Sequence, residues 1–276
     1  MTEINTGARN TWCPGCLNFQ LLVGIKNFIS KEIANNGKDN FAIVSGIGCH
    51  AKIFDYVNLK GINTLHGRVL PMMMGMKIGN PNLKIIGFSG DGDAYAEGME
   101  HLIHAARYNS DIKYIVHNNQ IFALTVGQPT PTSGRGTKGK TVPEGVKIGP
   151  INPIKIMLAS DASFVARVSP DLKEIEKVLE EAFKHKGFAF IEVLQPCIIF
   201  NDSRKLKDKM YSLEERRHNK QSFDEAMKRA EEFDYDKAEK IPMGIFYQRE
   251  REIFEDHFEQ LKNLKSAKSS WKEVKR

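Results

Sequence analysis

Two carboxylates and one amide follow apolar segments of this chain at a spacing that suits a metal-bridged phosphate group. Gly90-Asp91-Gly92-Asp93 comes after the apolar run Leu83–Phe88, and Asn119 lies 28 residues beyond Asp91, after another such run. Glycines let backbone amides approach an anion at the start of a helix, whereas a carboxylate repels that anion unless a cation lies between them. Mg²⁺ prefers oxygen ligands. We therefore predict Mg²⁺ bound by Asp91, Asn119 and the backbone carbonyl of Ile121; a tight turn with a helix-capping aspartate is the alternative.

The four cysteines of the chain form a second candidate centre. Cys13 and Cys16 have Cys-x-x-Cys spacing, Cys49 follows an apolar run, and Cys197 follows the last such run. Four thiolates at one edge of a fold can bind tetrahedral Zn²⁺ or an iron–sulfur cluster, and buried cysteines without a common ligand are the third alternative. A cytosolic chain of this size does not need disulfides, so the spacing favours metal or redox chemistry.

Alternating apolar patterns indicate the elements that must position these residues. Short apolar runs predict strands over 41–44, 83–88, 112–117, 164–168 and 188–194, and helical spacing predicts helices over 17–34, 69–78, 94–108 and 153–159. A further helix is expected after Ser169-Pro170, with Ser169 as its N-cap and Gly187 as its C-cap. This alternation predicts an α/β fold with a mostly parallel sheet and helices on both faces. The strand ends at 46–49, 90–93 and 118–119 should then share the carboxyl edge, where such sheets bind ligands.

The composition of the chain limits its domain organisation, its partners and its location. The 276 residues are 41% hydrophobic, enough for one sizeable core, and we predict a domain over 1–202 followed by a charged extension over 203–276 that wraps a partner or the core. The Gly-, Pro-, Thr- and Lys-rich stretch 126–153 is typical of a lid or a disordered loop. A net charge of +6, with its basic excess after residue 200, does not favour nucleic-acid binding. No signal peptide and no membrane span are expected, which predicts a cytoplasmic protein.

Several motifs, taken together, resemble the β subunit of 2-oxoacid:ferredoxin oxidoreductases, a family of thiamine diphosphate enzymes. The matches run in order from about residue 11 to residue 200 and are looser around Pro242–Tyr247. They are Trp12-Cys13-Pro14-Gly15-Cys16, Gly46-Ile47-Gly48-Cys49, His66-Gly67-Arg68, Gly90-Asp91-Gly92-Asp93, His104-Ala105-Ala106-Arg107-Tyr108-Asn109, Asp111-Ile112, Leu124-Thr125-Val126-Gly127-Gln128 with Pro131-Thr132, and Leu194-Gln195-Pro196-Cys197.

The resemblance implies the cofactors and the residues that hold them. It implies thiamine diphosphate anchored through Mg²⁺, and a [4Fe-4S] cluster bound by Cys13, Cys16, Cys49 and Cys197. The implied contacts with thiamine diphosphate are Ile47, Gly48, Cys49, His50, His66, Gly92, Asp93, Ala123 and Leu124. Lys52 and Arg68 are candidate anchors for the substrate carboxylate, although a solvated or structural role is the more frequent one for such residues.

The implied reaction is the oxidative decarboxylation of a 2-oxoacid to acyl-CoA and CO₂, with electrons passing through the cluster to ferredoxin. The carboxylate that activates thiamine diphosphate belongs to a pyrimidine-binding domain, whereas the motifs of this sequence are those of the diphosphate-binding domain. We therefore expect the chain to be active only together with an α subunit, which is either a separate chain or fused to a γ subunit. A cluster-free decarboxylase or synthase subunit and a zinc-stabilised, non-enzymatic binding protein are the alternatives.

Three departures from the family pattern affect these expectations. Leu17 replaces a common glycine after Cys16, Val126 replaces a frequently basic residue near the substrate, and His117-Asn118-Asn119 replaces a common Asp-Asn pair while keeping the metal-binding asparagine. Pyruvate, 2-oxoglutarate and branched-chain 2-oxoacids all stay open as substrates, and 2-oxoglutarate is favoured.

Overall fold

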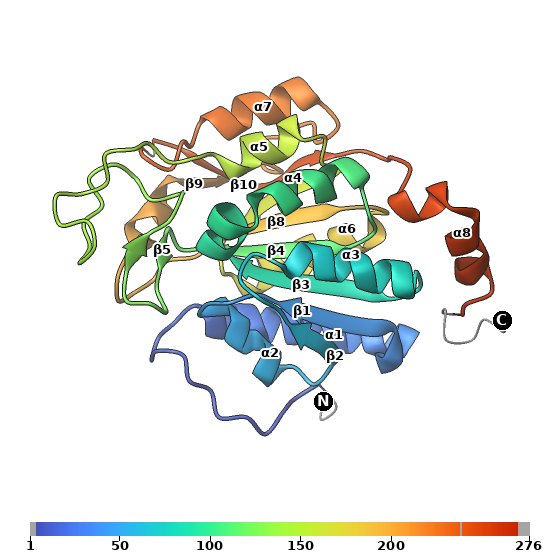
Figure 1. The fold of residues 1–276 in the computed structure, drawn as a ribbon. Helices are drawn as coiled ribbons and strands as arrows, with labels where there is room; N and C mark the ends of the chain where they lie inside the picture. The colour runs from blue at the N-terminus through green and yellow to red at the C-terminus, as the bar shows by residue number, and fades with distance from the viewer. Residues whose placement is uncertain (1–3, 238, 270–276) are drawn as a thin grey trace.

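The five apolar runs become neighbouring parallel strands of one sheet in the computed structural model, which describes residues 4–237 and 239–269. The sheet has eight strands in the order β2-β1-β3-β4-β8-β7-β10-β9 (Figure 1). The strands are β1 (Phe41–Ser45), β2 (Lys60–Asn63), β3 (Lys84–Gly90), β4 (Lys113–Asn118), β7 (Phe164–Val168), β8 (Ala189–Leu194), β9 (Met210–Ser212) and β10 (Ile241–Gln248).

Helices cover both faces of the sheet. On one face α1 (Asn18–Asn36) and α6 (Leu172–Lys184) pack against each other and against alternate residues of the strands, such as Ile43 and Ile115. On the other face lie α3 (Val69–Gly79), α4 (Met99–Tyr108), α5 (Pro153–Ala159) and α7 (Phe223–Glu231), which pack on the intervening residues, such as Val44 and Val116. The central strands are buried throughout because parallel sheets need cover on both faces. The predicted fold class is confirmed.

Two predicted helices differ in detail from the structure. The helix expected over 94–108 is divided: a π-helical turn spans Gly92–Glu97, and α4 begins after Gly98. The predicted caps of α6 are wrong. The side chain of Asp171 accepts hydrogen bonds from the backbone N–H groups of Lys173 and Glu174 and is the N-cap, while the helix ends at Lys184. Ser169 instead donates its hydroxyl to Glu174 Oε2 at 2.8 Å.

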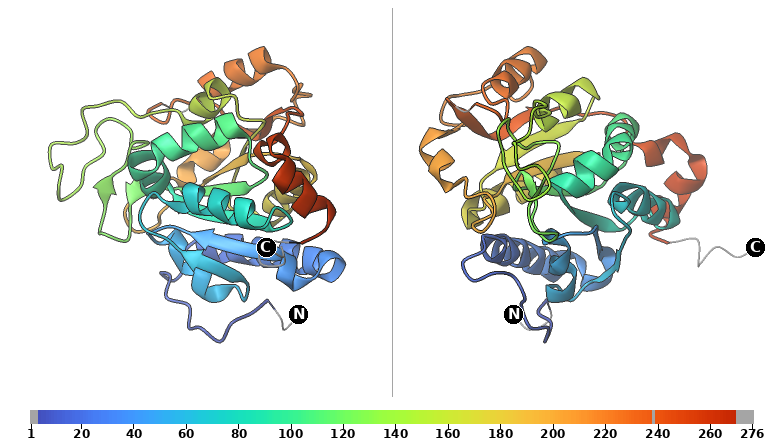
Figure 2. Two further views of the ribbon diagram at one scale, coloured as in Figure 1. Left: turned by 45° about the vertical axis from the view of Figure 1, so that its right-hand side comes forward. Right: turned by 60° about the vertical axis from the view of Figure 1, so that its left-hand side comes forward.

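Part of the segment 203–276 belongs to the main sheet. β10 runs antiparallel to β7, with Gly244 opposite Arg167, and β9 pairs parallel with the other side of β10. The short α8 (Glu259–Ser266) lies over the turn between α3 and β3, where Asn82 donates to the Leu264 carbonyl at 3.3 Å (Figure 2). None of the helices within the described residues is long and apolar enough to cross a membrane.

Strand register aligns the loops that carry the candidate site. Ser45 lies opposite Phe88, and Gly90 lies opposite His117, so β1, β3 and β4 end side by side. The loop after β4 continues into a small hairpin of β5 (Ile121–Phe122) and β6 (Gln128–Pro129). A long loop then stands away from the sheet before α5 (Figure 1). The sheet therefore delivers the candidate residues to one edge.

Candidate cofactor site

A pocket at this edge is lined by every residue predicted to contact thiamine diphosphate or Mg²⁺. These twelve residues are Ile47, Gly48, Cys49, His50, His66, Asp91, Gly92, Asp93, Asn119, Ile121, Ala123 and Leu124. They come from the loop after β1, the segment before α3, the turn after β3 and the hairpin after β4. Segments separated by more than 70 residues therefore converge on a single space, as binding across the ends of parallel strands requires.

Asp91 and Asn119 supply oxygen atoms of the kind that Mg²⁺ binds. Asp91 is 2% exposed, and its Oδ2 accepts a hydrogen bond from the Thr132 hydroxyl at 3.0 Å. Burial raises the pKa of Asp91 to about 6, because the hydrogen bonds around it only partly replace water. A cation at this position would remove that penalty. Asn119 Oδ1 accepts from the Ile121 N–H at 3.0 Å, which holds the loop backbone close to the amide oxygen. The donor set fits a Mg²⁺ ion.

Asp93 ties three segments of the pocket together. Its Oδ1 accepts from the Gly67 N–H at 2.7 Å, and its Oδ2 accepts from the Ser89 hydroxyl at 2.5 Å. Imidazole nitrogens of His50 and His66 lie 3.4 and 3.6 Å from the same carboxylate. Burial alone would raise the pKa of Asp93, but the contacts with His50, Ser89 and Gly67 hold it below the usual value. Asp93 is therefore ionised and holds the surrounding segments of the pocket together.

Close backbone approach depends on Gly46, where an added methyl group would overlap the carboxylate of Asp93. We predict that Gly46→Ala displaces Asp93, lowers the free energy of unfolding by about 1–3 kcal/mol and weakens thiamine diphosphate binding. Gly75→Ala is the matched control, because a methyl group there meets nothing within 4 Å. Denaturant unfolding and a cofactor titration of both variants measure the effect. Equal stability and equal binding in the two variants would contradict this role of Gly46.

The four cysteines approach one another beside this pocket. Cys16 N–H donates to the Cys13 carbonyl at 3.0 Å, and the indole N–H of Trp12 donates to the Cys49 carbonyl at 2.7 Å, which holds the N-terminal loop against the turn after β1. Cys197 pairs through its backbone with Asn201. Burial, opposed by Lys52 and reinforced by the other three thiols, raises the pKa of Cys49 to about 11. A bound metal centre would replace the protons of these thiols and offset the charge of the thiolates.

This thiol set differs from the ligands of a single ion. Within residues 4–237 and 239–269, no three His, Cys, Asp or Glu side chains converge in the way that one bound metal ion requires. Each cysteine of a [4Fe-4S] cluster binds its own iron atom, so four neighbouring thiols need not meet at one point. Cys49 also lines the cofactor pocket, and the two candidate centres therefore share this residue.

The two candidate anchors for the substrate carboxylate lie outside this pocket. Lys52 Nζ donates to the Thr11 carbonyl at 3.1 Å. Arg68 is exposed, and its guanidinium donates to the Glu97 carbonyl at 2.9 Å. Neither residue lines the pocket, and a role of either as a substrate anchor stays a prediction.

The pocket also contains side chains that the sequence did not single out as site residues. Asn18, His117 and Gln195 lie in its lining, and His117 Nδ1 lies 2.9 Å from Asn18 Oδ1. Burial lowers the pKa of His117 to about 3, which keeps the ring neutral. One signal was present in the sequence: Asn18 is a polar residue on the apolar face of the predicted helix, where Leu21, Leu22 and Ile25 follow at helical spacing.

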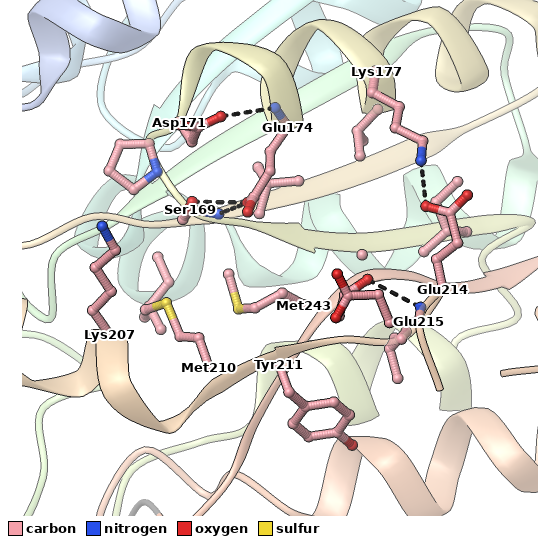
Figure 3. A pocket seen from close by; sticks show the side chains of 18 of the residues that line it. Ser169, Asp171, Glu174, Lys177, Lys207, Met210, Tyr211, Glu214, Glu215 and Met243 are labelled. Atoms are coloured by element: carbon pink, nitrogen blue, oxygen red, sulfur yellow. Dashed lines mark hydrogen bonds and ion pairs between the residues drawn. The ribbon is translucent and has the colours of Figure 1, made fainter. Parts of the chain in front are cut away.

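A larger hollow of about 1070 Å³ lies elsewhere, between the start of α6 and the segment that contains β9 (Figure 3). Met210 and Met243 contribute apolar surface to it, and Lys177 forms an ion pair with Glu214 across its rim. This groove contains none of the twelve predicted residues. Size alone is therefore a poor guide to the site here, and the smaller pocket has the convergent polar groups that cofactor binding requires.

Comparison with known proteins first defines the class. Residues 46–193 match the family described as "Thiamine pyrophosphate enzyme, C-terminal TPP binding domain", which spans the pocket and its strands. Residues 197–263 match the family that describes the C-terminal part of the pyruvate ferredoxin oxidoreductase β chain. The fold and the site therefore define a thiamine diphosphate-binding domain followed by a segment found in ferredoxin-linked oxidoreductases.

Full-length relatives narrow this class. The chain is 41% identical over 258 residues to the 2-oxoacid:ferredoxin oxidoreductase subunit beta of Saccharolobus solfataricus, covering 87% of this chain and 82% of that protein. It is 33% identical to the 2-oxoglutarate synthase subunit KorB of Archaeoglobus fulgidus, covering 92% and 89%. A solved 2-oxoglutarate:ferredoxin oxidoreductase from Magnetococcus marinus, with 2-oxoglutarate, coenzyme A and succinyl-CoA bound, superposes with a TM-score of 0.85 at 29% identity over 97% of this chain and 90% of that one. The chain belongs to the β subunits of the 2-oxoacid:ferredoxin oxidoreductases.

Proposed function

We propose that this β subunit binds thiamine diphosphate and Mg²⁺ in the pocket beside β3, and binds a [4Fe-4S] cluster through Cys13, Cys16, Cys49 and Cys197. Together with an α subunit it oxidises 2-oxoglutarate and coenzyme A to succinyl-CoA and CO₂, and it passes the electrons to ferredoxin. The observation that carries the proposal is the position of Cys49, which both lines the pocket and lies among the four thiols. With both groups bound, the cluster would lie beside the cofactor and could accept its electrons.

The residues of this chain have separate tasks in that reaction. Thiamine diphosphate, when bound, supplies a carbon nucleophile and an electron sink for the decarboxylation. Asp91, Asn119 and the Ile121 carbonyl would hold Mg²⁺ against the diphosphate. Asp93 holds the loop after β1 and the segment before α3 together, because its Oδ1 accepts hydrogen bonds from the Ile47 N–H at 3.4 Å and the Gly67 N–H at 2.7 Å. Phe122 packs so closely over Gly92 that an added methyl group would overlap its ring, so a glycine is needed at this position of the turn.

An α subunit is proposed because the pocket is incomplete in two respects. Its carboxylates are Asp91 and Asp93, and the described lining residues include no glutamate that could activate the cofactor. Ile47 and Leu124 also line the pocket while being 41% and 48% exposed. Apolar side chains at the rim of a site suit coverage by a partner protein. We propose that this rim is covered by the α subunit, which also supplies the activating carboxylate, and that residues 203–276 contribute to the same interface.

The substrate assignment is tested with the copurified α and β subunits, coenzyme A, a viologen dye and a panel of 2-oxoacids under anaerobic conditions. We expect 2-oxoglutarate to give the highest kcat/KM and the β chain alone to be inactive. Pyruvate or a branched-chain 2-oxoacid as the best substrate would overturn the substrate assignment. Substantial decarboxylation by the isolated β chain would overturn the need for an α subunit.

A further inference from the structure

Asp91 is the first member of a series of buried polar side chains that extends away from the pocket. The Thr132 hydroxyl lies 3.0 Å from Asp91 Oδ2 and 2.9 Å from Asn118 Oδ1. The side-chain amide of Asn118 donates to Glu192 Oε1 at 2.7 Å, and its oxygen accepts from the Gln120 N–H at 3.1 Å, which fixes the orientation of the amide. Thr132, Asn118 and Glu192 are all 0% exposed.

The far end of this series lies in the segment before β10. Glu192 Oε2 accepts from Arg167 Nε at 2.8 Å and from the Tyr235 hydroxyl at 2.6 Å. Arg167 Nη2 donates to the same Tyr235 oxygen at 2.6 Å, so each of the three groups contacts the other two. Arg167 is 0% exposed, and the rings of Phe233, Tyr235 and Phe246 surround its guanidinium at 5.1–5.3 Å.

The network contains a fully buried ion pair between Arg167 and Glu192. A buried ion pair can often be replaced by apolar residues without loss of stability, because the cost of removing both charges from water offsets their attraction. The position of the Arg167–Glu192 pair, close to the proposed metal ligands, indicates another role. Arg167 lies on β7 and Glu192 on β8, which pairs with β4, and Asn119 follows the last residue of β4. Gln120 links Thr132 to the segment of Tyr235, since its Nε2 donates to the Thr132 carbonyl at 2.7 Å and to the Tyr235 carbonyl at 3.2 Å.

We infer that Thr132, Asn118, Glu192, Arg167 and Tyr235 form a positioning network. It sets the orientation of the proposed Mg²⁺ ligand Asp91 and fixes the backbone on both sides of Asn119. The inference rests on the proposed function, because it assumes that these two residues bind Mg²⁺ with thiamine diphosphate. It assigns a role to Tyr235, a residue of the C-terminal segment that does not line the pocket. Groups that orient metal ligands through hydrogen bonds change metal affinity by about 10- to 100-fold when they are removed.

Thr132→Val tests the near end of the network in the αβ complex, after thiamine diphosphate and Mg²⁺ have been removed. We expect the Mg²⁺ concentration for half-maximal thiamine diphosphate binding to rise about 10-fold or more, and kcat to recover at saturating Mg²⁺. Thr132→Ser should restore the wild-type Mg²⁺ dependence. Thr137→Val is the matched control in the same loop, since the Thr137 hydroxyl donates to the Gly134 carbonyl and not to the network.

Tyr235→Phe tests the far end, since it removes the hydroxyl that joins Arg167 to Glu192 while keeping the ring. We expect a smaller rise in the Mg²⁺ requirement in the same direction. The inference would be overturned if Thr132→Val and Tyr235→Phe both kept the wild-type Mg²⁺ dependence while the wild-type complex bound thiamine diphosphate. A lower melting temperature of Tyr235→Phe would not rescue it, because that change alone indicates a structural role. A wild-type complex that binds no thiamine diphosphate with Mg²⁺ would instead overturn the proposed function, so the two failures are distinguishable.

Discussion

Asp91→Ala is expected to remove Mg²⁺-dependent thiamine diphosphate binding from the αβ complex. The carboxylate is buried at the end of β3 and is proposed to contact the metal directly, so its loss should cost at least about 100-fold in affinity, the upper range for groups that only support a metal ligand. Bound thiamine diphosphate can be measured by fluorescence after oxidation, following gel filtration in Mg²⁺. Activity with every 2-oxoacid should fall in parallel.

Asp171→Ala is the control for this substitution. Asp171 is an exposed N-cap of α6, and its loss should lower the free energy of unfolding by about 1 kcal/mol without changing bound cofactor. If Asp91→Ala retains thiamine diphosphate at a Mg²⁺ concentration that is just sufficient for the wild type, Asp91 is not a metal ligand. Other residues must then hold the diphosphate group.

Cys197→Ser is expected to have the second large effect, which is loss of the iron–sulfur cluster with retention of thiamine diphosphate. Cys197 does not line the cofactor pocket, whereas it lies close enough to Cys49 to raise the pKa of that thiol. Iron and acid-labile sulfide should fall sharply, and ferredoxin reduction should drop to the background rate. Bound thiamine diphosphate per chain should stay near the wild-type value.

Cys13→Ser should reproduce this pattern, because Cys13, in the N-terminal loop, is another proposed ligand of the same cluster. Normal iron content and normal ferredoxin reduction in either variant would contradict the assignment of the four cysteines. Loss of thiamine diphosphate together with iron would show that the two centres are not separable in the way proposed here.

The sequence could bring several candidate residues to one edge because they follow short apolar runs. Such runs become buried parallel strands, and parallel strands end at a common edge, so Asp91 and Asn119 could be placed together before their contacts were known. The same reasoning brought Cys49 to the edge beside them. Local pattern was sufficient here because strand order and strand ends do most of the positioning.

Contacts between distant segments could not be predicted in the same way. β10 was not among the predicted strands. Its strand partners are β7 and β9, and nothing within its own residues shows that pairing. The N-cap of α6 was misplaced by two residues, since Ser169, Pro170 and Asp171 all favour helix starts and only the folded geometry selects Asp171. The link from Thr132 to Glu192 and Tyr235 joins residues 60 to 103 positions apart, and only tertiary structure shows it.

The central claim is that the cofactor pocket and the four-cysteine centre act as one redox unit, and electron paramagnetic resonance tests it most directly. The anaerobic αβ complex, loaded with thiamine diphosphate and Mg²⁺, is mixed with 2-oxoglutarate and coenzyme A and frozen. We predict the signal of a reduced [4Fe-4S] cluster in the wild type, and no such signal in Asp91→Ala or Cys197→Ser. A colourless wild-type protein that contains one zinc ion per chain and gives no signal would contradict the account.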